Sequence, residues 1–129
     1  MASARGLVFD VRFDAVVDVK GLTEMASPET LRRARTVLAM RVGLDSNRYC
    51  KVDTWLLQST MQVTSDFENG EVRWSARKNG RDYARYAYYQ EGLGPESVKN
   101  KRTSKWFETA KSKRIDSWRR YVKNEILKG

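Results

Sequence analysis

The C-terminal part of the chain predicts a long amphipathic helix over residues 104–127. Its large apolar side chains recur at three- and four-residue spacing, and basic side chains occupy many of the other positions. About 22 residues at roughly 1.5 Å each give a rod of roughly 33 Å. We expect this helix to cover a sheet built by the rest of the chain. Its apolar stripe consists of Phe107, Ala110, Ile115, Trp118, Val122 and Ile126, with Trp106 and Tyr121 at the edges.

A second helix is predicted over residues 28–43. Ser27 can accept a hydrogen bond from a free amide, Pro28 lacks only a donor that the first turn does not need, and Glu29 complements the positive end of the helix dipole. Gly43 can end the helix. The apolar residues at helical spacing are Leu31, Ala34, Leu38 and Val42, flanked by Val37 and Met40.

Three further segments predict a small antiparallel sheet. Residues 6–13 alternate apolar and polar side chains, which is typical of a half-buried strand. Asn69-Gly70 favours a two-residue turn with positive φ at both positions, so a hairpin of 61–67 with 72–78 is expected. Its register would pair Phe67 with Val72, Ser65 with Trp74 and Val63 with Ala76.

The aromatic segment 83–88 is expected to be the last strand of this sheet, with a short helix as the alternative. Residues 14–26 show neither the period of a helix nor that of a strand, and their structure is left open. The sequence therefore predicts an α+β fold in a single domain over residues 1–129. In this fold a small antiparallel sheet is packed by two helices, at about 28–43 and 104–127.

The charge of the chain is concentrated near its C-terminus. The net charge is +9 over 129 residues, and residues 99–129 hold eleven basic against three acidic side chains. Such a segment attracts an anionic partner, which could be nucleic acid, an acidic protein or anionic lipid. Contact with DNA, contact with an acidic neighbour and simple solvation are the open alternatives. The candidate contacts are Lys111, Lys113, Arg114, Arg119, Arg120 and Lys123.

The sequence lacks the side chains that most catalytic and metal sites use. It has no histidine, which is the usual general base near neutral pH and the commonest metal ligand. Its one cysteine, Cys50, excludes an intrachain disulfide and is expected to be an unreactive, partly buried thiol. We expect no enzymatic activity, no cofactor and no metal.

No apolar stretch approaches the ~20 residues needed to cross a bilayer, and residues 1–5 do not open a signal peptide. The expectation is a soluble, unsecreted protein with no membrane partner.

Three segments, taken in order, resemble a family of phage proteins. Residues 52–59 read Val-Asp-Thr-Trp-Leu-Leu-Gln-Ser, residues 83–89 read Tyr-Ala-Arg-Tyr-Ala-Tyr-Tyr, and residues 104–111 read Ser-Lys-Trp-Phe-Glu-Thr-Ala-Lys. They resemble the minor capsid proteins encoded between capsid and tail genes in siphophages. That group is similar to neck and tail-completion proteins, in which a Val-Asp-Thr-Gly segment precedes a hairpin, a Tyr-Ala-rich strand and a terminal helix. Trp55 stands here in place of that glycine.

The resemblance covers residues 28–127 and implies a structural role in the virion neck, after assembly in the host cytoplasm. Copies of the chain would form a ring, with six copies favoured and twelve possible, around the DNA exit channel. The ring would meet a head-closure or adaptor ring, a tail terminator, or both, and could touch DNA without sequence preference. The alternative function is a small basic nucleic-acid-binding protein.

Site residues follow from the same segments. Tyrosine and arginine are favoured interface anchors, although stacking on unpaired bases and packing within the chain are open alternatives. Asp53 and Thr54 resemble the signature pair of the family, and their expected role is a structural cap before the hairpin. The expected subunit contacts are Tyr83, Arg85, Tyr86, Tyr88, Tyr89, Trp106 and Phe107.

Overall fold

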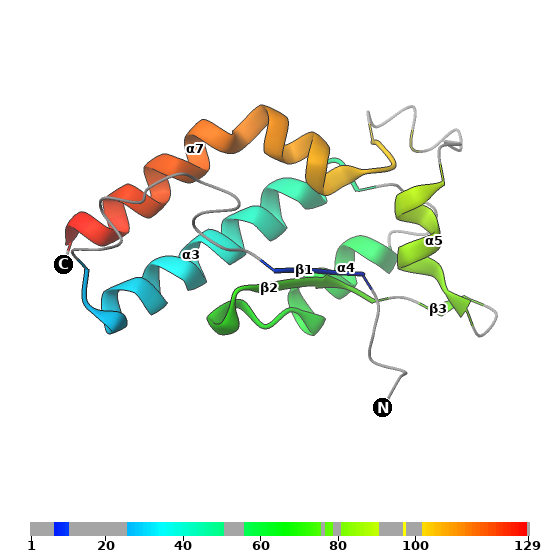
Figure 1. Cartoon of the computed structure of the whole chain (residues 1–129). Coiled ribbons are helices and arrows are strands. Elements are labelled where there is room, and N and C mark those ends of the chain that lie inside the picture. Colours follow the sequence, from blue (N-terminus) through cyan, green and yellow to red (C-terminus); the bar gives the residue numbers. More distant parts are fainter. Residues whose placement is uncertain are drawn as a thin grey trace.

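The chain folds into a mixture of helices and short strands, which confirms the predicted α+β class (Figure 1). The computed structural model describes residues 7–10, 26–50, 56–75, 77–78, 81–90, 97 and 102–128. The elements are β1 (Leu7–Asp10), α3 (Pro28–Asn47), α4 (Leu56–Thr64), the 3-10 helix η2 (Phe67–Asn69), β2 (Glu71–Trp74), β3 (Arg77–Lys78), β4 (Arg81–Asp82), α5 (Tyr83–Tyr89) and α7 (Trp106–Lys128).

The helix α3 begins where the sequence predicts and ends later. The backbone N–H of Thr30 donates to Ser27 Oγ at 3.2 Å, with Pro28 in the first turn. Gly43 does not end the helix, because α3 continues to Asn47. A Cβ atom at Gly43 would lie 2.6 Å from Met61 Sδ, so this glycine allows α4 to pack closely against α3.

The helix α7 matches its predicted bounds within two residues and runs antiparallel along α3 (Figure 1). Arg33 Nε lies 3.5 Å from Glu125 Oε1, near the start of α3 and the end of α7. Among the described residues, no helix is long and apolar enough to cross a membrane.

The predicted hairpin around Asn69-Gly70 is wrong. Most of the segment 61–67 belongs to α4, and β2 pairs antiparallel with β1 instead. Leu7 lies opposite Trp74 and Phe9 opposite Val72, so the expected pairs of Val72 with Phe67 and of Trp74 with Ser65 do not form. The turn itself exists, since Gly70 has a φ of 74°, but it connects a helical segment to a strand.

Side-chain hydroxyls take the place of the predicted strand beside β2. The backbone N–H of Arg73 donates to Ser65 Oγ at 2.8 Å, and Thr64 Oγ1 donates to the carbonyl of Arg73 at 3.0 Å. Polar backbone groups at this edge of β2 are thereby paired without a second strand.

The predicted strand over 83–88 is also wrong, and the alternative of a short helix is right. Residues 83–89 form α5, which directly follows the two-residue strand pair β3 and β4. Ala84, Ala87 and Tyr88 are buried at the three- and four-residue spacing of a helix.

The core lies between the two long helices, α4, α5 and the β1–β2 sheet. Its largest fully buried side chains include Trp74, Trp106, Trp118 and Tyr88. Cys50 is also fully buried, rather than partly. Asp53, Thr54, Ala76 and most of the 14–26 segment lie outside the described residues.

Candidate interaction surfaces on α5 and α7

The outer face of α5 presents two tyrosines to solvent. Tyr86 and Tyr89 are 60% and 61% exposed, and their three-residue spacing places them on one side of the helix. Arg85 and Gln90 are exposed beside them. Tyrosine is enriched in protein interfaces relative to the rest of the surface, so this face is a candidate for contact with a partner.

Tyr88, which lies between these two tyrosines in the sequence, anchors α5 to the core. Tyr88 packs edge-on against Trp106, with ring centroids 4.8 Å apart, and its hydroxyl donates to Glu108 Oε1 at 3.0 Å. Burial and the negative charge of Glu108 raise the pKa of Tyr88 well above its ordinary value. Ser104 Oγ also donates to the carbonyl of Gln90, so the end of α5 is tied to the segment that leads into α7.

The expected subunit contacts therefore separate into two groups. Arg85, Tyr86 and Tyr89 are exposed, whereas Tyr83 and Phe107 are half-buried. Tyr88 and Trp106 are fully buried within one chain, so assigning them to a subunit interface is wrong. The alternative of packing within the chain holds for these two, because a helix over 83–89 turns Tyr88 inward and Tyr86 and Tyr89 outward.

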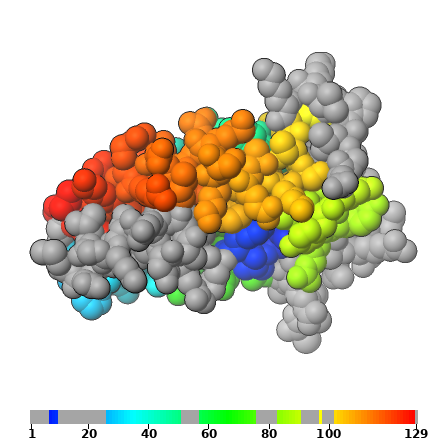
Figure 2. All heavy atoms as spheres, turned by 45° about the horizontal axis from the view of Figure 1, so that its top comes forward, coloured from blue at the N-terminus to red at the C-terminus, as the bar shows by residue number. Residues whose placement is uncertain are grey.

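The outer face of α7 carries four of the six predicted basic contacts. Lys113, Arg119, Arg120 and Lys123 are exposed, whereas Lys111 and Arg114 are half-buried. In Figure 2, α7 forms a long ridge across the visible face, and α5 lies at the end of this ridge where α7 begins. The basic side chains and the exposed tyrosines thus occupy separate regions of the surface.

Two of the three carboxylates of α7 are engaged by residues of other elements. Glu108 accepts the hydroxyl hydrogen bond of Tyr88. Glu125, whose side chain is only 14% exposed, lies 3.5 Å from Arg33 and 3.0 Å from Lys128. Asp116, the third, is exposed and lies 3.3 Å from Arg119. The outer face consequently keeps an excess of positive charge.

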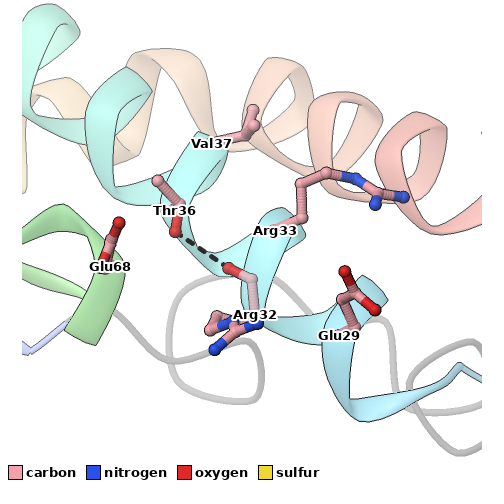
Figure 3. A pocket seen from close by; sticks show the side chains of 6 residues that line it. All are labelled: Glu29, Arg32, Arg33, Thr36, Val37 and Glu68. Carbon is pink, nitrogen blue, oxygen red and sulfur yellow. Dashed lines mark hydrogen bonds between the residues drawn. The ribbon is translucent and has the colours of Figure 1, made fainter.

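A shallow depression lies on the surface of α3 (Figure 3). It has a volume of about 440 Å³ and is lined by Glu29, Arg32, Arg33, Thr36, Val37 and Glu68. Figure 3 shows Arg33 turned toward α7 and Glu68 on the opposite wall, so acidic and basic groups do not converge. Within the described residues no group of three or more His, Cys, Asp or Glu side chains could hold a metal.

Exposed apolar side chains on α3 were not identified from the sequence as a surface. Met40 and Leu44 are both exposed, one turn apart, and Arg41 beside them lies over the Tyr121 ring at 4.3 Å from its centroid. The signal that could have revealed them is their position on the helix, opposite the buried Leu38 and Val42.

Comparison of the chain with protein-family models, with curated proteins and with solved structures yields no match.

Proposed function

We propose that the chain is a structural subunit of the neck of a tailed phage, where identical copies form a ring between head and tail. Six copies are favoured and twelve are possible, and the neighbours are a head-closure or adaptor ring and a tail terminator. The three segments that resemble phage minor capsid proteins support this role. Within this proposal the chain has no catalytic activity.

The observation that carries the proposal is the exposed pair Tyr86 and Tyr89 on α5. A tyrosine offers about 150–250 Å² of surface for burial, and tyrosine and arginine are enriched among residues that dominate binding energies. Arg85 lies beside the pair and is also exposed. A neighbouring copy that covers this face would remove two large aromatic groups from water.

The attachment of α5 to the core favours this use. The adjacent Tyr88 is held by Trp106 and Glu108, so the backbone that carries the exposed tyrosines is fixed before binding. A fixed helix loses less conformational entropy on association than a loose segment does.

The test compares assembly of the wild type with that of the double variant Tyr86→Ala/Tyr89→Ala, by mass photometry in the presence of the purified neighbouring ring. We expect the double variant to stop assembling. The matched control is Val63→Ala, which removes an 84% exposed apolar side chain from α4 and should leave assembly unchanged. Equal assembly of the double variant and the wild type would contradict the role of α5.

The proposed location of the chain in the virion neck is tested separately, by an electron-microscopy reconstruction of the neck. A neck ring whose density matches α3 and α7 is expected. A well-resolved neck without this chain would exclude the proposed function.

A further inference from the structure

We infer that the outer face of α7 binds the phosphate backbone of double-stranded nucleic acid through Lys113, Arg119, Arg120 and Lys123. This inference goes beyond the proposed ring and does not depend on it, since the face belongs to a single chain. The basic residues belong to α7 and the exposed tyrosines to α5, which lies at the end of the ridge where α7 begins (Figure 2).

The spacing of these residues places them on one side of the helix. Arg120 lies two turns after Lys113, and Lys123 lies one turn after Arg119. All four are exposed, and the ten-residue interval from Lys113 to Lys123 covers about 15 Å of helix axis. Duplex DNA carries one phosphate per roughly 1.7 Å, so about nine phosphates of the two strands lie within that length.

The charge of this face is not cancelled by the helix itself. Glu108 accepts the hydroxyl of Tyr88 at the start of α7, and Glu125 lies against Arg33 and Lys128. Asp116 does contact Arg119, but its side chain is 83% exposed, and such solvent-exposed ion pairs are weak enough for a phosphate to displace them.

The scarcity of apolar groups between residues 112 and 123 argues against a protein or a membrane as the partner. The exposed positions between residues 112 and 123 are Ser112, Lys113, Asp116, Arg119, Arg120, Tyr121 and Lys123, so a single side chain among them, the 38% exposed Tyr121, is aromatic. Protein interfaces need apolar or aromatic anchors, and a helix that lies on a membrane needs an apolar side that enters the lipid. Contacts with phosphate need only cations.

The same composition favours a duplex over a single strand. Single strands bind mainly through bases that stack on aromatic side chains, and the one aromatic side chain among these positions, Tyr121, has its ring covered by Arg41. The guanidinium carbon of Arg41 lies 4.3 Å from the centroid of the Tyr121 ring, so one face of this ring is already occupied.

The experiment measures binding of the full chain to a fluorescent 20-base-pair DNA duplex by polarisation, over a series of salt concentrations. Four phosphate contacts predict a slope of log K against log salt of about −3.6, which is a loss of roughly 100-fold between 50 and 200 mM salt. The variant Arg119→Gln/Lys123→Gln should reduce the slope to about −1.8, because each contact contributes about 0.9.

The control Arg32→Gln/Arg48→Gln removes the same charge from two other exposed arginines, one on α3 and one directly after it, and should keep the wild-type slope. The variant Arg119→Lys/Arg120→Lys, which keeps the charges, should also keep it. Far-ultraviolet circular dichroism and thermal melting establish that each variant is folded.

Three results would overturn the inference. They are an equal loss of slope in the Arg32→Gln/Arg48→Gln control, tighter binding to a single strand than to the duplex, and binding to polyglutamate with the same dependence on Arg119 and Lys123. The last would identify an acidic protein as the partner. All measurements use one chain free of neighbouring rings, so failure of the ring proposal would not change them.

Discussion

Trp118 on α7 donates its indole N–H to Asp45 near the end of α3, with 2.8 Å between Nε1 and Oδ2. Both side chains are buried, so this hydrogen bond joins the two long helices inside the core. It also explains how an aspartate can lie within an otherwise apolar contact, because buried polar groups are tolerated when they are paired.

Replacement of Asp45 tests the contribution of this bond. Asp45→Ala removes a charged acceptor and leaves the Trp118 N–H buried and unpaired, so we expect the free energy of unfolding to fall by about 2–3 kcal/mol. Asp45→Asn keeps an acceptor and should cost roughly half as much. Urea denaturation measures both. A loss below about 1 kcal/mol for Asp45→Ala would mean that water replaces the aspartate.

The substitution Gly43→Ala tests the close contact of α3 with α4. An added methyl group would lie 2.6 Å from Met61 Sδ and 3.3 Å from Val72 Cγ1. Overpacking of this kind costs about 1–3 kcal/mol, against a gain of about 1 kcal/mol in helix propensity, so Gly43→Ala should destabilise the fold by about 1 kcal/mol.

The control for this prediction is the same change in a Met61→Ala background, where the methyl group has room. There Gly43→Ala should stabilise the protein, as chemical denaturation would reveal. An identical change in the free energy of unfolding in both backgrounds would show that the contact with Met61 does not determine the effect of Gly43→Ala.

The two long helices were predictable because their signals are local. Ser27, Pro28 and Glu29 mark the start of α3, and an apolar stripe repeats along the whole of α7. The end of α3 was missed, because a glycine signals either a helix end or a close contact, and only the position of Met61 distinguishes the two.

The sheet was not predictable in the same way. The partner of β2 is β1, more than sixty residues away, and no local pattern encodes that pairing. Asn69-Gly70 does form a turn, but the sequence does not reveal that hydroxyls of Thr64 and Ser65, rather than a strand, pair with Arg73. A segment as short as 61–67, with apolar residues only at Met61, Val63 and Phe67, does not distinguish a strand from a helix.

For the candidate surfaces, too, part of the arrangement was predictable from the sequence and part was not. The basic residues of α7 were identified because the period of the helix was right, and four of the six are exposed. The aromatic segment was recognised, but a strand over 83–88 would place Tyr86 and Tyr88 on the same face. The helix separates them, burying Tyr88 and exposing Tyr86.

The exposed tyrosines of α5 should affect assembly without affecting the stability of the fold. Tyr86→Ala and Tyr89→Ala each remove a side chain that is about 60% exposed. The free energy of unfolding, measured by thermal denaturation, should therefore change by no more than about 0.5 kcal/mol. Tyr88→Ala should instead cost about 3–5 kcal/mol, because it opens a cavity in the core. A comparable loss at all three positions would show that α5 is buried as a whole.

The buried hydroxyl of Tyr88 should make stability fall at high pH. Its pKa is raised by burial and by Glu108, so the folded chain retains a proton that the unfolded chain releases above pH 10, the ordinary tyrosine value. The stabilisation is complete below that pH. Above it, the free energy of unfolding should decrease by about 1.4 kcal/mol per pH unit from this group alone.

Tyr88→Phe isolates this effect from the titration of lysines and exposed tyrosines. Below pH 9 the variant should lose about 1 kcal/mol, since the hydrogen bond to Glu108 is missing. As the pH rises from 10 to 11, the variant should lose stability less steeply than the wild type, because residue 88 no longer ionises on unfolding. Urea denaturation at half-unit pH steps gives both curves. Parallel curves across this range would mean that the hydroxyl ionises as readily in the folded chain as in the unfolded one.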